Sequence, residues 1–139
     1  MSTYRQAVKR YEKLCKQKDV PAETVLAYLV ELSNQERYNL YMHYEEEMDP
    51  ELERRFDEGM ARILNHEPMG HVLGYSWFYG YKFLVNPDVL IPRPETEELC
   101  GRILGKLDRY IPDQPAVECA DVGTGSGDIA ITLAKEEKR

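Results

Sequence analysis

The chain has 139 residues, with 25 acidic against 18 basic side chains and a formal net charge of −7 at pH 7. This length allows one domain of ordinary size, or a small domain with part of a second one. The acidic balance argues against direct binding of nucleic acid, which needs a basic face.

Residues 1–67 are expected to form a bundle of short helices. Apolar residues recur there at spacings of three and four, which is the period of one helix face. Four start signals divide the region: the possible capping boxes Thr3–Gln6 and Ser33–Glu36, Pro21 at a first helical position, and the pair Asp49-Pro50. The apolar face of these helices contains several tyrosines. Aromatic residues at this spacing usually lie in a core, and a docking surface for a protein is the alternative.

At Pro68 the apolar period changes. The segments Val72–Phe78 and Tyr81–Val85 are rich in β-branched and aromatic residues and flank the pair Tyr79-Gly80. Two such segments around a two-residue turn predict a β-hairpin. Residues 68–94 are therefore expected to form a hairpin and a proline-rich linker.

The run Pro92-Arg93-Pro94 follows, with Glu95 and Thr96 directly after it. Two prolines hold the backbone extended around the arginine, and Pro94 suits the start of a helix that we expect to run to about Leu107. One interpretation is a stiff connector between domains. The other is a rigid ledge at a site entrance, with Arg93, Glu95 and Thr96 bordering the site.

Near the end of the chain an apolar stretch, expected to be a strand over Ala116–Val122, meets a glycine-rich turn and then a helix-forming stretch, Asp128–Glu137. Strand, glycine turn and helix present backbone N–H groups to a nucleotide-like ligand. The spacing is G-x-G-x-G and resembles motif I of class I S-adenosylmethionine-dependent methyltransferases. A turn that serves packing alone is the other interpretation. The candidate cofactor-binding residues are Asp121, Gly123, Thr124, Gly125, Ser126 and Gly127.

Two further expectations concern this carboxyl-terminal region. The acidic residue that holds a cofactor ribose usually lies about 20 residues beyond the turn, which is past Arg139, so we expect a truncated cofactor site. The strand over Ala116–Val122 has no neighbour to pair with, so we expect the tail from about Pro112 to be disordered, or to self-associate through its open edge.

Three cysteines, Cys15, Cys100 and Cys119, lie far apart and form no C-x-x-C pair. We expect reduced thiols and neither a disulfide framework nor a metal site. The first residues lack the apolar segment of a secretory signal, and no apolar run is long enough to span a bilayer. These patterns favour a cytoplasmic protein with no membrane partner.

The chain also resembles a known family over its whole length, the protein-(glutamine-N5) methyltransferases of the PrmC/HemK type. Three blocks carry the resemblance in the family's order: Glu67–Gly74 together with Phe78–Phe83 and Val85, then Val89–Glu97, then Asp121–Gly127. The resemblance implies a mainly α chain: a helical bundle (1–67) that docks a release factor, a β-hairpin linker (68–94), and the truncated first β-α unit of a class I, Rossmann-like α/β methyltransferase domain (95–139).

The family transfers a methyl group from S-adenosylmethionine to the glutamine amide of a Gly-Gly-Gln loop in peptide chain release factors. It does so with an Asn-Pro-Pro-Tyr segment that orients the amide nitrogen, and this segment is absent here. An amide nitrogen is a poor nucleophile, so most of the rate depends on that orientation. We therefore expect no catalytic residue in these 139 residues, no methyl transfer, and weak or absent cofactor binding.

Two alternatives to this function stay open. In the first alternative, the ordered part is a module that docks a protein partner without chemistry. In the second, the chain belongs to an amino-methyltransferase that acts on nucleic acid with the same Asn-Pro-Pro-Tyr chemistry. The acidic balance and the order of the three blocks count against the second alternative.

Overall fold

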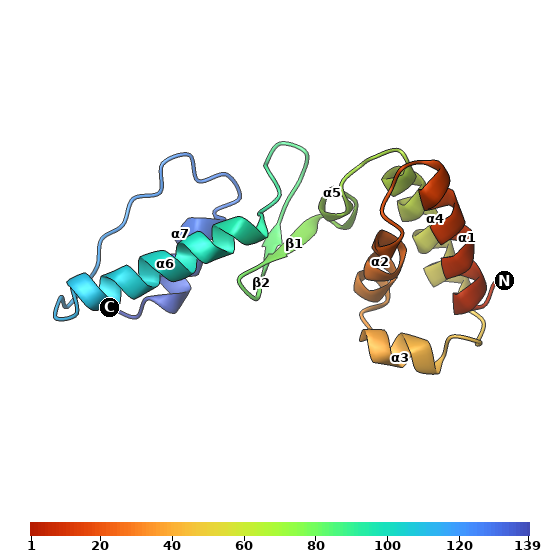
Figure 1. Ribbon diagram of the computed structural model, residues 1–139, viewed down its shortest axis with the longest axis horizontal. Helices are drawn as coiled ribbons and strands as arrows, with labels where there is room; N and C mark the ends of the chain where they lie inside the picture. The colour runs from red at the N-terminus through yellow and green to blue at the C-terminus, as the bar shows by residue number, and fades with distance from the viewer. The chain divides into compact units, whose positions relative to one another are not determined.

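Seven helices and two strands follow one another along the chain in the computed structural model, which describes residues 1–139 (Figure 1). The chain divides into two units, Met1–Leu73 and Gly74–Arg139. The first unit contains α1 (Tyr4–Gln17), α2 (Glu23–Ser33), α3 (Arg37–Met42), α4 (Pro50–Leu64) and α5 (Met69–Leu73). The second contains β1 (Tyr75–Phe78), β2 (Tyr81–Leu84), α6 (Pro94–Tyr110) and α7 (Asp128–Glu136).

Side chains fix the starts of α1 and α4 as the sequence predicts. Thr3 Oγ1 accepts the Gln6 N–H at 3.2 Å and Gln6 Oε1 accepts the Thr3 N–H at 3.1 Å, which confirms the first capping box. Asp49 Oδ1 accepts the N–H groups of the second and third residues of α4, and Pro50 occupies the first helical position. Both devices satisfy amides that a helix start leaves without partners.

The second capping box is wrong. Ser33 is the last residue of α2, and its hydroxyl donates to the Val30 carbonyl at 3.3 Å. Asn34 follows with a φ of +52°, the left-handed conformation that ends many helices and that asparagine tolerates. The next helix, α3, begins at Arg37 without a side-chain cap, and Pro21 lies two residues before α2 instead of inside it.

The core of the first unit is built around Phe56 of α4, which is fully buried. Tyr11 of α1 meets the Phe56 ring edge-on at 5.3 Å, and Tyr28 of α2 stacks on it at 5.9 Å. Gly59 leaves the space that the Tyr28 ring needs, since a Cβ there would lie 1.8 Å from the Tyr28 hydroxyl oxygen. These three aromatic rings join α1, α2 and α4.

Burial raises the pKa of Tyr11 to about 12, and its hydrogen bond to Asp57 at 2.8 Å contributes to the shift. The phenol therefore stays a neutral donor at physiological pH. The core interpretation of the tyrosines is confirmed for Tyr4 and Tyr11, which are buried, and is wrong for Tyr38 and Tyr41, which are exposed.

A two-residue hairpin is confirmed in the second unit. Phe78 pairs with Tyr81, and the intervening Tyr79 and Gly80 have φ values of +51° and +78°, as a type I′ turn requires. The first strand is shorter than expected, because Val72 and Leu73 belong to helix α5 and pack against the core of the first unit. Tertiary packing here decides between helix and strand for a short apolar run.

One face of the hairpin packs on α6 and α7. Phe78 and Phe83, with ring centroids 5.9 Å apart, form a small core with Cys100 of α6, and the partly buried Ile129 and Leu133 of α7 complete it. Figure 1 shows α6 and α7 side by side, with the hairpin near the first turn of α6. The hairpin thus belongs to the second unit.

The strand expected over Ala116–Val122 is not formed. The residues between α6 and α7 contain neither helix nor strand, and the sheet of the structure consists of β1 and β2 alone. A strand needs a neighbour for its backbone groups, and β1 and β2 pair with each other. The helix expected after the glycine turn is confirmed as α7.

Candidate functional site

The glycine-rich turn Asp121–Gly127 leads directly into α7. Gly123, Gly125 and Gly127 have φ values of +76°, +60° and +80°, which side chains other than glycine rarely adopt. Gly125 has no other atom within 4 Å of where its Cβ would lie. The turn therefore keeps its backbone open to a ligand.

Hydrogen bonds within the turn hold its shape. Thr124 Oγ1 donates to Asp121 Oδ2 at 2.9 Å, and the Gly127 N–H donates to the Thr124 carbonyl at 2.9 Å. Gly127 is the N-cap of α7 and its carbonyl accepts the Ile131 N–H at 2.9 Å. The Ser126 hydroxyl oxygen is buried without a hydrogen-bond partner. All six candidate cofactor-binding residues are thus gathered in one short turn at a helix start, where free N–H groups favour polar or anionic ligand groups.

The candidate site-bordering residues lie at the start of α6. Arg93 is the N-cap, Pro94 is the first helical residue, and the Thr96 N–H donates to the Arg93 carbonyl at 3.0 Å. Glu95 stands in the first turn, where its negative charge is favourable to the helix dipole. No hydrogen bond or ion pair joins Arg93, Glu95 or Thr96 to the glycine turn.

Cys100 of α6 is fully buried in the small core that α6 forms with the hairpin. Burial raises the pKa of its thiol, and the negative charges of Asp128, Asp121 and Glu97 raise it further. The thiol stays protonated and acts as a packing group.

Glu97 is a residue that sequence reasoning missed. Its Oε1 accepts the N–H of Tyr79, the first turn residue of the hairpin, at 2.8 Å. The Tyr79 hydroxyl lies 3.7 Å from the position of a Cβ on Gly101, one helical turn further along α6. Glu97 thus attaches the hairpin turn to α6. The available signal was the hairpin turn itself, whose first amide needs an acceptor.

We expect Glu97→Ala to destabilise the second unit by about 1–2 kcal/mol, because it leaves a partly buried amide without an acceptor. Denaturation followed by the fluorescence of Trp77, the single tryptophan, measures this, and exchange of the Tyr79 amide locates it. Glu95→Ala, an exposed carboxylate of the same helical turn, is the matched control. Equal stability of the two variants would contradict the role of Glu97.

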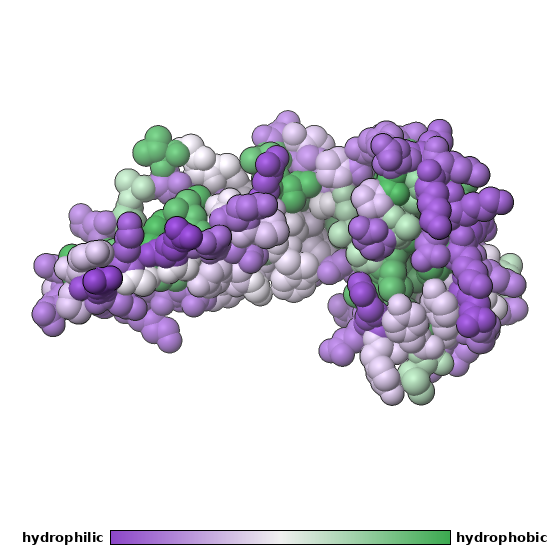
Figure 2. All heavy atoms as spheres, viewed as in Figure 1, coloured by the Kyte–Doolittle hydropathy of each residue, from purple (hydrophilic) through white to green (hydrophobic).

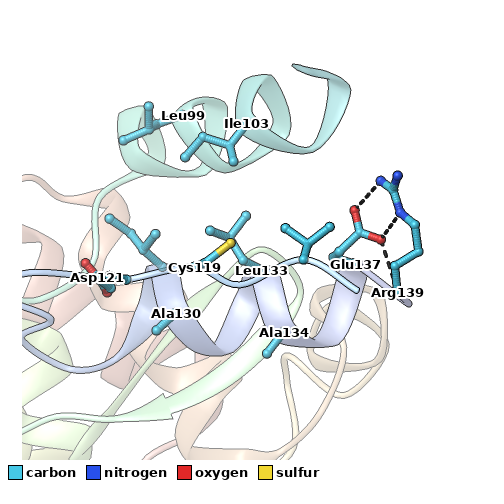
Figure 3. A pocket seen from close by; sticks show the side chains of 12 residues that line it. Leu99, Ile103, Cys119, Asp121, Ala130, Leu133, Ala134, Glu137 and Arg139 are labelled. Carbon is cyan, nitrogen blue, oxygen red and sulfur yellow. Dashed lines mark hydrogen bonds and ion pairs between the residues drawn. The ribbon is translucent and has the colours of Figure 1, made fainter. Parts of the chain in front are cut away.

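A cavity of about 560 Å³ lies between α6, α7 and the segment that precedes the glycine turn (Figure 3). Leu99 and Ile103 of α6 point toward Cys119 and Leu133 across it. Arg139 and Glu137 lie at one end, and their hydrogen bonds lower the pKa of Glu137 to about 2. The lining is predominantly aliphatic, and Asp121, Glu137 and Arg139 are its charged members.

The profile of the PrmC N-terminal domain matches residues 5–74. The chain belongs to this family. The match covers all five helices of the first unit from the second residue of α1 onward.

Curated relatives extend the match into the second unit. The chain is 42% identical over 116 residues to the release factor glutamine methyltransferase of Bacillus cereus, which covers 84% of this chain and 40% of the relative. It is 42% identical over 123 residues to that of Neisseria gonorrhoeae (88% and 42%) and 32% identical over 133 residues to that of Leptospira interrogans (94% and 46%). The chain spans about two-fifths of the length of these relatives.

The structure contains no helix that is both long enough and apolar enough to cross a bilayer.

Proposed function

We propose that this chain is the amino-terminal part of an S-adenosylmethionine-dependent methyltransferase that modifies the glutamine amide in the Gly-Gly-Gln motif of peptide chain release factors. The observation that supports it most is the Leptospira match. It spans 94% of the 139 residues, so about eight residues fall outside it and the turn Asp121–Gly127 falls inside it. The Leptospira relative therefore aligns with the region of the turn as well as with the helical domain.

In this proposal the turn binds S-adenosylmethionine. Gly123 and Gly125 let the backbone approach the ligand, and the start of α7 supplies N–H groups. Arg93, Glu95 and Thr96 border the site, and residues 95–139 begin a Rossmann-like methyltransferase domain in the cytoplasm. The strands of that domain would cover the aliphatic sides of α6 and α7 that line the cavity of Figure 3.

The 139 residues by themselves transfer no methyl group in this proposal, because the groups that orient the amide are absent from them. They also bind S-adenosylmethionine weakly or not at all. Loss of one charged hydrogen bond to the ribose alone costs about 1.5–3 kcal/mol, or about tenfold to 150-fold in affinity.

A chimera tests the function. We expect the 139 residues, fused in register to the remainder of the Bacillus cereus relative, to methylate a release factor, as detected by radioactive methyl from S-adenosylmethionine. A release factor with the motif glutamine changed to alanine is the control for the position. The unfused chain should give background labelling and no low-micromolar binding in calorimetry. A folded, cofactor-binding chimera without transfer would contradict the proposed function, and labelling by the unfused chain would contradict its inactivity.

A second function, a module that docks a protein without chemistry, is compatible with the first. Exposed aromatic side chains on α3 favour it.

A further inference from the structure

One side of α7 faces the hairpin. Ile129 and Leu133 of α7 pack against the small core that the hairpin forms with α6. Thr132, one position before Leu133, is fully buried as well. Residues at spacings of three and four lie on one side of a helix. The hairpin therefore holds the first two turns of α7 from that side.

The far end of α7 is attached to the same hairpin through Tyr81 of β2. Glu136 lies three residues after Leu133, and its Oε1 accepts the Tyr81 hydroxyl at 2.5 Å. The Lys135 ammonium lies 4.8 Å from the centre of the Tyr81 ring, a cation–π distance. The hydrogen bond to Glu136 raises the pKa of Tyr81, so the phenol stays a neutral donor. A helix held at both ends neither rotates about its axis nor slides along it without breaking a contact.

The position of the glycine turn depends on α7. The turn ends at Gly127, the N-cap of the helix, and its three glycines have left-handed conformations that impose little steric restraint. The Gly127 N–H donates to the Thr124 carbonyl, which ties the last residues of the turn to the start of the helix. A movement of α7 would therefore carry the turn with it.

The cavity of Figure 3 lies on a different side of α7 from the hairpin. Ala130, Ala134 and Glu137 line it from α7, and Leu99 and Ile103 line it from α6. Figure 2 shows hydrophobic atoms gathered between α6 and the chain that leads into α7. Strands of the proposed methyltransferase domain would cover the cavity side, so the hairpin would remain the support of the other side.

We propose that Tyr81 is a positioning residue for the cofactor turn. Through Glu136 it fixes α7, and through α7 it fixes the backbone N–H groups that would bind S-adenosylmethionine. This inference rests on the proposed function for the identity of the ligand. Tyr81 acts without touching the cofactor, because binding groups that are held in one place need no ordering when the ligand arrives.

Amide exchange in the 139-residue chain tests the attachment of α7. Tyr81→Phe removes the hydroxyl and keeps the ring, and Glu136→Ala removes the acceptor. We expect the Ile131 amide, bonded to the Gly127 carbonyl at 2.9 Å, to exchange about twofold to tenfold faster in either variant. The double variant should exchange no faster than the single ones, because all three lack the same hydrogen bond. Tyr110→Phe, the same chemical change at a 67% exposed tyrosine of α6, is the matched control.

Calorimetry on the chimera tests the positioning of the turn. We expect Tyr81→Phe and Glu136→Ala to weaken the binding of S-adenosylmethionine by about twofold to tenfold, and to leave the affinity for the release factor unchanged. Tyr110→Phe should bind both as the unchanged chimera does. A loss of stability alone would change neither affinity well below the temperature of unfolding.

Equal exchange of the Ile131 amide in Tyr81→Phe and Tyr110→Phe would overturn the inference, because the hydroxyl would then not hold α7. Faster exchange with unchanged cofactor affinity would overturn the positioning role, and so would an equal loss of affinity for the release factor. These results leave the proposed methyl transfer intact, since transfer by the unchanged chimera is a separate measurement. An unchanged, folded chimera that does not bind S-adenosylmethionine would overturn both the inference and the proposed function.

Discussion

Phe56→Ala is expected to lower the free energy of unfolding of the first unit by about 3–5 kcal/mol, the usual cost of deleting a buried phenylalanine ring. Phe56 is fully buried and lies between Tyr11 and Tyr28, at ring distances of 5.3 Å and 5.9 Å. Neither tyrosine can collapse freely into the space. The Tyr11 hydroxyl is held by Asp57 at 2.8 Å, and Tyr28 packs over Gly59. The cavity should therefore stay largely open, and this places the cost toward the upper end.

Urea denaturation followed by circular dichroism at a helical wavelength measures this loss. Phe56→Leu is the matched control, since it keeps most of the apolar volume and should cost clearly less. A unit as small as Met1–Leu73 is expected near the lower end of the usual stability range of about 5–15 kcal/mol, so the alanine variant should be close to unfolded at 37 °C. A loss below about 1 kcal/mol would show that the three rings do not form the centre of the bundle.

Local signals predict the parts of this fold that local interactions determine. The capping box of Thr3 and the Asp49-Pro50 start depend on groups within three residues of each other, and both are formed. The hairpin turn at Tyr79-Gly80 is likewise set by the φ values that its two residues adopt. The prediction from Ser33 was wrong because serine also suits a last helical turn, and Asn34 ends α2 there.

Contacts between distant segments decide the parts that the sequence did not predict. Val72 and Leu73 have strand-like composition, but they pack as a helix against the first unit. The role of Glu97 depends on the hairpin, which is 18 residues away along the chain. Tyr11 and Tyr41 both follow the helical spacing, so the spacing alone does not predict that Tyr11 lies in the core and Tyr41 at the surface. The direction of each face is set by how the helices pack.

In the candidate site, too, the feature set by local interactions was predicted, and the feature that depends on distant segments was not. The glycine turn was identified from its spacing, and its three glycines adopt the left-handed conformations that such a turn needs. The strand expected before it has no pairing partner in the structure, because β1 and β2 pair with each other, and it is not formed.

Amide hydrogen exchange should therefore differ by about a thousandfold or more between the segment Ala116–Val122 and the bundle core in the 139-residue chain. No backbone N–H of this segment donates to a backbone carbonyl, and Val122 is 95% exposed. Amides of the bundle core open only with global unfolding, which costs about 5 kcal/mol or more. The Ile131 amide of α7, bonded to the Gly127 carbonyl at 2.9 Å, is an internal control with intermediate protection.

Protection of the segment equal to the core in dilute monomer would contradict this expectation. Protection that rises with protein concentration would instead show that the open edge of the segment pairs with a second copy. In the chimera the same amides should become protected, because a parallel sheet would then supply both neighbours of the strand.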